Sequence, residues 1–320
     1  MENEFIVEDA HRQSLKVKIG LTGATNTGKT WSALLLAGGL LLSEGKTDPK
    51  NKTKPDWDKV VLIDTERNRS LAYAELGDIG KFKYISFKPP YSPDRLLLAL
   101  ASAKRSGAEV IIIDSFTHIW NGEGGLLEIV NEKTEKSKSG NSFTAWNGKT
   151  GGTAVQNNMV NKLLDTDTHV IVTFRQKMDY KMEVDAVTGK TKVVKHGTKP
   201  IQRDDLEYEF DITLKFNNLH QGEIIKNIMP VLGDNGDIIE PVTIELGKEI
   251  GDYFANGISQ EEILESKRLA GIEQIKNLGN KNPSLITLYK TIYKDKKISE
   301  LTLKQTKNVL EKFNQVLFER

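Results

Sequence analysis

Residues 15–30 read LKVKIGLTGATNTGKT, and this stretch decides the fold. Its second half, GATNTGKT at 23–30, matches G-x-x-x-x-G-K-[ST], the phosphate-binding P-loop pattern. Val17, Ile19 and Leu21 alternate with polar or small residues, which predicts a half-buried strand before the loop. WSALLLAGGLLL, which follows the loop, predicts an apolar helix. The alternative is a glycine-rich turn with an incidental Lys, which the flanking strand and helix disfavour.

The P-loop pattern predicts a site for a nucleoside triphosphate. Small residues let the backbone curl so that its N–H groups converge on phosphate oxygens, and the helix adds its positive N-terminal end. Lys29 is the expected partner of the β- and γ-phosphates, and the Thr30 hydroxyl is the expected ligand of Mg²⁺. The predicted nucleotide-binding residues are Gly23, Asn26, Thr27, Gly28, Lys29, Thr30 and Trp31.

Composition limits the class of protein. The 320 residues are 38% hydrophobic and 28% charged, which is typical of a soluble globular protein with one large α/β domain and a smaller one. No apolar run is long enough for a membrane helix, and the acidic N-terminus does not resemble a secretory signal. The absence of cysteine excludes disulfides and thiolate zinc sites and agrees with a cytosolic location. A net charge of +1 excludes a uniformly basic nucleic-acid coat, so such binding needs local patches.

Apolar runs and helical patterns alternate along most of the chain, which predicts a mostly parallel sheet flanked by helices. The predicted strands cover 17–21, 60–63, 82–87, 110–113, 168–174, 206–217 and two further runs within 224–239, and the predicted helices cover 31–42, 70–79, 95–107 and 155–165. We expect a flexible segment at 1–13, an ATPase core at 14–250 and a C-terminal helical domain at 258–320. Ligands of such sheets bind at the carboxyl ends of the strands, so the residues after each strand are the informative ones.

Acidic residues follow two of these strands. Asp114 ends VIIID, the Walker B pattern, where it is expected to hold Mg²⁺ opposite Thr30; the alternative is an N-cap for the next helix. Asp64 and Glu66 end the second strand, near the expected γ-phosphate. Glu66 is the predicted general base for the attacking water, and the alternative is a surface acid.

Arg175 and Gln176 follow the strand at 168–174. Either can contact the γ-phosphate, and an Arg at this position can also reach into a neighbouring subunit. The alternative for both is an ordinary salt-bridged or solvated side chain. His118 comes soon after Walker B, and we interpret it as a structural histidine.

Two segments combine basic and aromatic residues, which suits a single-stranded backbone and stacked bases. One is the glycine-rich stretch 132–152, and the other is the basic, turn-rich stretch 175–203, in which 185–189 resembles a hairpin turn. The predicted contacts are Lys136, Lys138 and Trp146 in the first and Lys177, Tyr180, Lys181, Lys190, Lys192 and Lys195 in the second. The alternative for each segment is a solvated loop.

The ordered motifs resemble those of the RecA-core ATPases, over about residues 15–220. Within that group the chain is most similar to the phage-encoded AAA/RecA-like single-strand annealing and recombination proteins, the Sak-four-like proteins. The resemblance rests on GATNTGKT, VLIDTERNRSLAYAELG (61–77), VIIIDSFTHIW (110–120), THVIVTFRQKMDY (168–180) and KPIQRDDLEYEFDITLKF (199–216).

This resemblance implies a RecA-like P-loop core and an ATP site with Mg²⁺ between subunits of a ring or filament. It implies that Glu66 activates water, that Tyr73 stacks on adenine and that Ser115 is the hydroxyl residue after Walker B. It also implies that Arg175 or Gln176 is the nucleotide sensor and that the following segment belongs to the DNA-binding loops. The implied partners are single-stranded DNA, other copies of the chain and a phage single-strand-binding or replication protein, in the cytoplasm of a bacterial host.

The chain departs from the bacterial recombinases in two places. They place Gln directly at the end of the fourth strand, where this chain has Phe174, Arg175 and Gln176. No clear N-terminal polymerisation arm is present, although FIVED at 5–9 could dock on a neighbour, so ring and filament both stay open.

Three functions agree with the motifs, because a P-loop identifies the nucleotide and not the output. The first is an ATP-dependent, DNA-stimulated recombination protein that binds single strands. The second is a helicase-loader-like or partner-regulated ATPase that acts on a protein. The third is a P-loop kinase for a small metabolite, in which Glu66 would have no obvious role.

Overall fold

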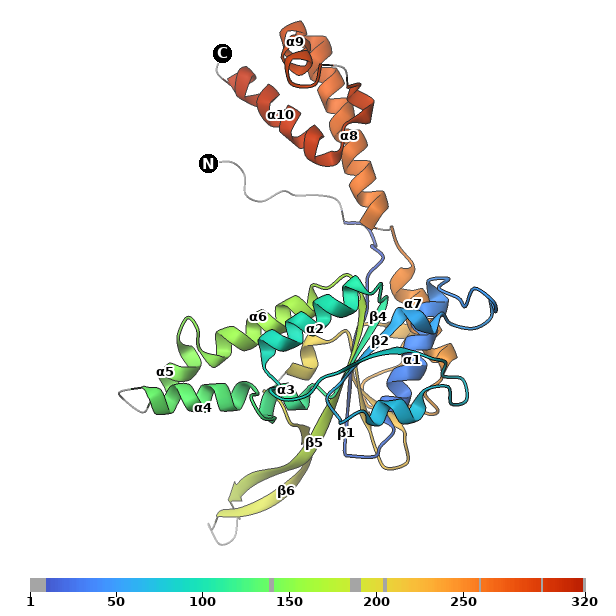
Figure 1. Cartoon of the computed structure of the whole chain (residues 1–320), viewed down its shortest axis with the longest axis vertical. Coiled ribbons are helices and arrows are strands. Elements are labelled where there is room, and N and C mark those ends of the chain that lie inside the picture. The colour runs from blue at the N-terminus through green and yellow to red at the C-terminus, as the bar shows by residue number, and fades with distance from the viewer. Residues whose placement is uncertain are drawn as a thin grey trace. The chain divides into compact units, whose positions relative to one another are not determined.

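The computed structural model describes residues 10–137, 141–184, 191–203, 206–258, 260–294 and 296–318, and the side chains of 179–184, 191–197, 260, 261, 263 and 318 fall outside this description. The chain divides into two compact units. One is Lys16–Ala255, and the other joins Asn256–Arg320 with residues 10–15 at the N-terminal end. Figure 1 shows the elements of each unit.

The larger unit is built on one sheet, which has nine strands in the described part of the chain. Its order is β3-β2-β4-β5-β1-β7-β8-β9, with β6 paired to the extension of β5. The strands are β1 (Lys18–Gly23), β2 (Val60–Asp64), β3 (Lys83–Ser86), β4 (Val110–Asp114), β5 (His169–Val184), β6 (Thr191–Pro200), β7 (Ile212–Phe216), β8 (Gly222–Asn227) and β9 (Ile238–Ile239). The pairs from β3 to β7 are parallel, and β7–β8, β8–β9 and β5–β6 are antiparallel. The predicted α/β class with a mostly parallel sheet is therefore confirmed.

Helices cover both faces of the sheet (Figure 1). The helices of this unit are α1 (Lys29–Ser43), α2 (Pro93–Arg105), α3 (Thr117–Asn121), α4 (Leu126–Lys136), α5 (Ser142–Asn147), α6 (Gly152–Leu164) and α7 (Ile244–Ala255). The packing of alternate residues explains why the strand β4 is apolar up to Asp114. Val110 and Ile112 pack in the cluster that holds α1 and α7, whereas Ile111 and Ile113 pack in the cluster that holds α2 and α6. Both faces of the strand are buried, as expected for a parallel sheet.

The register brings the carboxyl ends of the strands to one edge. Asp64 at the end of β2 lies opposite Asp114 at the end of β4. Gly23 at the end of β1 lies opposite Arg175 in β5 and Phe216 at the end of β7. Residues distant in the sequence thus meet where ligands of such sheets bind.

Four segments differ from the sequence-based expectation. The strand predicted at 206–217 begins only at Ile212, because Leu206–Glu209 forms a 3-10 helix. Residues 70–79 do not form an α-helix; Arg69–Tyr73 forms a short 3-10 helix instead. The strand expected to end at 174 continues to Val184 and pairs with β6 as a long hairpin, because the basic segment satisfies its backbone groups across the two strands. The expected turn at 185–189 lies outside the described residues. Helix α7 has no counterpart among the predicted elements.

The smaller unit is helical. It contains α8 (Gln260–Lys281), α9 (Pro283–Ile292) and α10 (Leu303–Phe318). Ile275, Leu285, Val309 and Phe313 form its buried core, each at most 1% exposed. Gln13 forms an isolated parallel bridge with Ile258. Within the part of the chain that the structure describes, every helix is too short or too polar to cross a bilayer.

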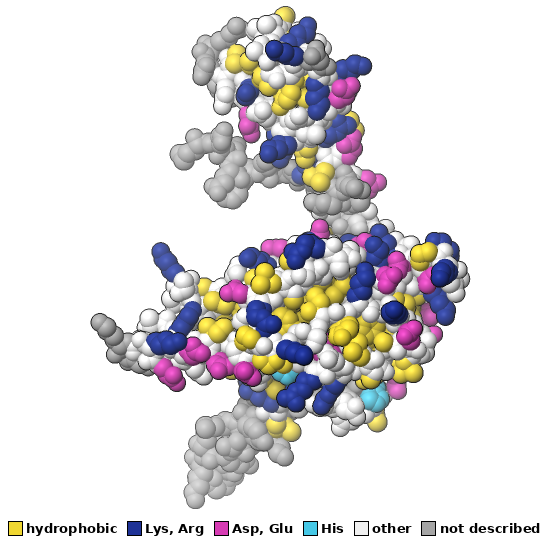
Figure 2. All heavy atoms as spheres, in the orientation of Figure 1, with side chains coloured by type: hydrophobic (Ala, Val, Ile, Leu, Met, Phe, Trp, Pro, Cys, Tyr) yellow, Lys and Arg dark blue, Asp and Glu magenta, His cyan; other side chains and the backbone are white. Residues whose placement is uncertain are grey.

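The face of the molecule in Figure 2 carries Lys and Arg side chains interspersed with Asp and Glu. This mixture matches a net charge of +1. Any strongly charged binding site must therefore be a local one.

Candidate nucleotide-binding site

The P-loop links the end of β1 to the start of α1. Its backbone takes the left-handed conformation at Asn26 (φ 67°) and at Gly28 (φ 86°). The Thr27 hydroxyl donates to the Ala24 carbonyl at 2.9 Å and closes the loop on itself. A side chain at Gly28 would also press on His220, whose Nδ1 lies 3.1 Å from the position of a Cβ atom. The loop is thus shaped to present backbone N–H groups at the N-terminus of a long helix, which is a favourable place for phosphate.

Lys29 lies at the centre of this loop and is only 8% exposed. Its Nζ donates to the carbonyl of Gly23 at 3.0 Å and also to that of Ala24. Burial lowers the pKa of Lys29, although the carboxylates of Asp114 and Glu66 act in the opposite direction. A buried ammonium group is favoured by a nearby anion, so the position suits the phosphates of a nucleotide.

Asp114 lies beside the first turn of α1. Thr30 donates from its hydroxyl to Asp114 Oδ2 at 2.6 Å, and the Thr173 hydroxyl donates to Oδ1. Burial raises the pKa of this carboxyl group, and the two hydroxyl donors oppose the effect. A hydroxyl and a carboxylate in contact are the oxygen donors that Mg²⁺ prefers, with the remaining positions supplied by phosphate and water. Among the described residues no group of three or more His, Cys, Asp and Glu could hold a metal ion.

Comparison with known families agrees with this geometry. Residues 15–229, more than half of the 320 residues, match the model of a family described as an AAA domain. The chain belongs to the AAA domain family. Membership supports nucleotide binding and ATP hydrolysis in general. No curated protein matches the chain.

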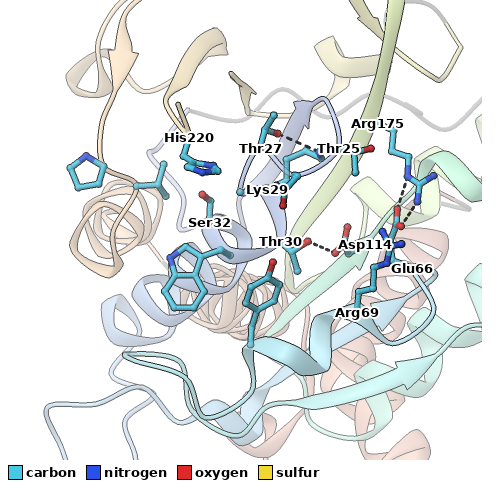
Figure 3. Close-up of a pocket in the computed structure, with 16 residues that line it drawn as sticks. Thr25, Thr27, Lys29, Thr30, Ser32, Glu66, Arg69, Asp114, Arg175 and His220 are labelled. Atoms are coloured by element: carbon cyan, nitrogen blue, oxygen red, sulfur yellow. Dashed lines mark hydrogen bonds and ion pairs between the residues drawn. The ribbon is translucent and has the colours of Figure 1, made fainter. Parts of the chain in front are cut away.

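The cavity of this AAA domain has a volume of about 490 Å³, within the usual range for ligand sites. Figure 3 shows the side chains that line it. They are Thr25, Asn26, Thr27, Gly28, Lys29, Thr30, Trp31, Ser32, Glu66, Arg69, Tyr73, Asp114, Arg175, His220, Pro241 and Val242. All the predicted nucleotide-binding residues except Gly23 line the cavity, and Gly23 contributes the carbonyl that accepts from Lys29.

Glu66, the predicted base, is held in an ion pair with Arg175, the predicted sensor (Figure 3). Arg175 Nε donates to Glu66 Oε1 at 2.7 Å, and Arg175 Nη2 donates to Glu66 Oε2. Ser115 donates from its hydroxyl to the same Oε1 at 3.0 Å. Burial raises the pKa of Glu66, but the Arg175 guanidinium outweighs this effect and holds the pKa below its usual value. Glu66 is therefore an ionised carboxylate at the cavity wall.

Asp64 holds the backbone of Glu66 in place. It is buried, so the alternative of a surface acid at a strand end does not apply to it. It is 1% exposed and accepts from the backbone N–H groups of Glu66 at 2.7 Å, Asn68 at 3.1 Å and Ser70 at 3.1 Å. These bonds fix the turn that follows β2 and so fix the direction of Glu66.

His118 is partnered, in agreement with its interpretation as a structural residue. Its Nδ1 lies 2.7 Å from the Thr65 hydroxyl, and its ring stacks on Tyr91 at a centroid distance of 5.2 Å. Burial lowers its pKa. Thr117, which precedes His118 in α3, accepts from the backbone N–H of Arg175 at 2.9 Å. Helix α3 is therefore also bonded to β5.

Two of the residues that line the cavity are aromatic and in contact with each other. Trp31 and Tyr73 lie edge to face with their centroids 5.7 Å apart. This contact brings together the residue after the P-loop and the residue for which the family resemblance implies adenine stacking. Both rings are partly exposed at the cavity, where an aromatic face suits a base.

Sequence reasoning missed six of the lining residues, which are Thr25, Ser32, Arg69, His220, Pro241 and Val242. His220 could have been found, because it lies in the turn after β7, a strand whose carboxyl end meets the same edge. Pro241 and Val242 follow the short antiparallel strand β9 and carry no comparable signal.

The other predicted residues lie outside this cavity. Gln176 accepts from the Thr198 hydroxyl at 2.8 Å across the β5–β6 hairpin, so Arg175 and not Gln176 faces the cavity. Lys177 is exposed at the start of the same hairpin. Lys136 pairs with Glu132 at 3.0 Å on the exposed face of α4. Lys138, Lys190 and the side chains of Tyr180, Lys181, Lys192 and Lys195 lie outside the described residues.

Trp146 forms part of a second aromatic contact. Its ring lies 5.9 Å from that of Trp120, and both pack on a small cluster of Leu126, Val130 and Ala145. The two Trp rings, Thr153, Gln202 and Arg203 line a shallow pocket of about 360 Å³. Gln202 Nε2 is buried there without a hydrogen-bond partner among the described residues.

Proposed function

We propose that this AAA domain is an ATP-dependent protein that binds single-stranded DNA and promotes annealing or exchange of strands. ATP would bind with Mg²⁺ between Lys29, Thr30 and Asp114, and Glu66 would orient or deprotonate the attacking water. Trp31 and Tyr73 would contact the base. Mg²⁺ would neutralise charge that develops on the phosphates.

The observation that carries the proposal is the position of Arg175. It lines the nucleotide cavity and belongs to β5, which continues without interruption into the basic hairpin. A change in the contacts of Arg175 between nucleotide states would therefore act on the strand that leads to Lys177 and the hairpin beyond it. This continuity links ATP turnover to the segment for which we expect DNA contacts.

The pocket beside the hairpin supports the same proposal. It combines the rings of Trp120 and Trp146 with the guanidinium of Arg203 and the Gln202 amide, whose nitrogen has no partner in the described part of the chain. Aromatic rings that accept stacked bases, with nearby cations and amide donors, are typical of single-strand sites. The alternative is a satellite core with a solvated rim, which the buried Gln202 nitrogen disfavours because it has no partner among the described residues.

Two assays on the full chain test the proposal. Fluorescence anisotropy of a labelled oligothymidine strand should show binding that depends on the nucleotide, and annealing of two complementary oligonucleotides should be faster with the protein and ATP. Trp146→Ala should weaken strand binding by about 1–3 kcal/mol, the usual contribution of one stacked base. Absence of strand binding in every nucleotide state would contradict the proposal and favour an ATPase that acts on a protein.

Self-assembly into a ring or filament is a further part of the proposal. Sedimentation of the protein with ATP and with single strands tests it, because an active recombination protein of this kind should form a larger species when both are present. A monomer under every condition would contradict it.

A further inference from the structure

A second cavity lies on the other side of the Glu66–Arg175 ion pair. It has a volume of about 620 Å³ and is formed by the turn after β2, the segment after β3 and the region around α3. Glu66, Arg69 and Arg175 line both this cavity and the nucleotide site. The ion pair is therefore a wall shared by two cavities.

The second cavity has an excess of positive charge. Its charged or titratable residues are Asp64, Glu66, Arg67, Arg69, Lys88, His118, Glu123 and Arg175. The Asp64 carboxylate accepts hydrogen bonds from backbone N–H groups, and the Glu66 carboxylate pairs with Arg175. Glu123 is the remaining acid, and its side chain has no hydrogen-bond or ion-pair partner among the described residues. Arg67, Arg69 and Lys88 are exposed, and none of them forms an ion pair with another described residue. Four cationic and three acidic side chains thus line the cavity, and three of the cations have no ion-pair partner among the described residues.

The turn after β2 is built to present these cations. Asp64 binds the N–H groups of Glu66 and Asn68, and the backbone at Arg67 and Asn68 is left-handed, with φ of 60° and 63°. Ser86 at the end of β3 donates to the side chain of Asn68 at 2.7 Å. The bonds hold Arg67 at the mouth of the cavity beside the segment that carries Lys88.

The inner wall of the cavity is aromatic. Tyr91 stacks on His118 at 5.2 Å and on Phe87 at 6.0 Å, and Tyr91 and Phe87 are buried. These rings stack on one another and Arg95 lies over Phe87, so they form a rigid wall, and the exposed cations supply the groups that bind phosphate.

We propose that this second cavity binds phosphate groups of a single nucleic-acid strand, a site additional to the two basic segments. The inference rests on the proposed function, because it assigns a place to the strand. A bound phosphate would compete with Glu66 for the Arg175 guanidinium. Strand binding would then free Glu66 for the attacking water, which links the two cavities through one side chain.

The test is strand binding by an Arg67→Gln, Lys88→Gln double variant. The matched control is Lys50→Gln, Lys52→Gln, which removes the same charge from an exposed loop between α1 and β2, at the opposite edge of the sheet. Binding of a labelled oligothymidine strand is measured over a range of salt concentrations. Each lost phosphate contact lowers the salt slope for a single strand by about 0.7, so the double variant should lose about 1.4 while the control keeps the wild-type slope. Circular dichroism of both variants verifies that they are folded.

Other outcomes separate the two proposals. If wild type binds the strand and the double variant keeps its full salt slope, the second cavity is not a strand site, but the proposed function stands. If wild type binds no strand, the proposed function itself is wrong. If calorimetry shows that inorganic phosphate or free ATP binds wild type more tightly than the double variant while strand binding is equal, the cavity serves a small phosphate ligand, and this also overturns the inference.

Discussion

Arg175 Nε lies 2.7 Å from Glu66 Oε1, so the residue predicted to sense the nucleotide holds the residue predicted to activate water. Arg175 belongs to β5, and Glu66 lies in the turn after β2. Ser115, which follows β4, donates a third hydrogen bond to the carboxylate. A base in a bidentate pair with Arg is ionised but has fewer free lone pairs for a water. The proposed mechanism therefore requires this pair to rearrange before Glu66 can act as the base.

Replacement of the base tests its role. Glu66→Gln keeps the volume and loses the carboxylate, so ATP hydrolysis should fall by about 10²–10⁴, the usual contribution of a general base. ATP binding should stay close to wild type, because Lys29, Thr30 and Asp114 are unchanged. Single-turnover hydrolysis and calorimetric ATP binding measure the two effects. The control Glu273→Gln alters an exposed acid on α8 and should hydrolyse normally. Equal hydrolysis in Glu66→Gln and wild type would rule out Glu66 as the base.

The pH dependence of hydrolysis tests the ion pair. Burial raises the pKa of Glu66 and Arg175 lowers it to below the usual value, so removal of the guanidinium leaves the effect of burial. The base must be ionised, and the acidic limb of kcat should therefore move to higher pH in Arg175→Ala. Arg175→Lys keeps a positive charge and should show a smaller displacement. An acidic limb at the same pH in wild type and Arg175→Ala would contradict this role, whatever the level of activity.

A separate cluster at the opposite edge of the sheet makes a pH-dependent contribution to stability. Val17 donates from its backbone N–H to His169 Nδ1 at 3.1 Å, so Nε2 carries the proton and donates to Glu44 at 2.9 Å. Lys16 also pairs with Glu44. Burial raises the pKa of Glu44, but His169 and Lys16 outweigh it and lower the pKa to about 2 from 4.5.

The sign of the effect follows from this lowered pKa. Because the folded state holds the carboxylate ionised, the stabilisation is present above pH 4.5 and is lost as the pH falls from 4.5 towards 2. The loss should be on the order of 3 kcal/mol larger in wild type than in Glu44→Gln. Urea unfolding of both proteins across this range measures it. Parallel pH profiles would show that Glu44 does not make this contribution.

The contact between α1 and α7 depends on glycine. A Cβ at Gly39 would lie 2.1 Å from the Ile244 carbonyl oxygen and 2.4 Å from the Lys248 nitrogen, both backbone atoms that cannot move aside. Gly39→Ala should lower the free energy of unfolding by about 3 kcal/mol. Gly38→Ala is the matched control, because its Cβ meets the edge of the Trp57 ring at 3.1 Å and the gain in helix propensity offsets part of that contact. Equal stability of the two variants would contradict the close packing.

Local pattern predicted most of the strands, whereas helix α7 depends on tertiary contact. The strands β2, β4 and the first half of β5 are continuous apolar runs with both faces buried, so their pattern was sufficient. Alternation also located β1, but this strand is buried on both faces and not half-buried, because it lies between β5 and β7 in the sheet. Helix α7 was missed because Gly247 and Gly251 weaken its local propensity, whereas in the structure a Cβ at Gly247 would lie 2.5 Å from the Leu36 carbonyl oxygen. Tertiary contact with α1 compensates for the poor propensity, and this contact is not visible in the local sequence.

The site, like the fold, has a part that the sequence predicted and a part that it did not. The P-loop and Walker B residues were predictable, because motif and strand-end position place their side chains together. The pairing of Glu66 with Arg175 was not, because it depends on the order of β2, β4 and β5 in the sheet and on the bonds of Asp64. The second cavity also depends on this turn and on the segment after β3, which carries no motif.

The most direct measurement is steady-state ATP hydrolysis by wild type and Lys29→Ala, each with and without single-stranded DNA. Lys29 is buried among the carbonyls of the P-loop, and its loss removes the main cation for the phosphates. We predict that single strands raise hydrolysis by wild type and that Lys29→Ala loses it in both conditions. Hydrolysis by Lys29→Ala at the wild-type rate would show that the P-loop is not the active site, and a wild-type rate unaffected by single strands would contradict the link between ATP turnover and DNA.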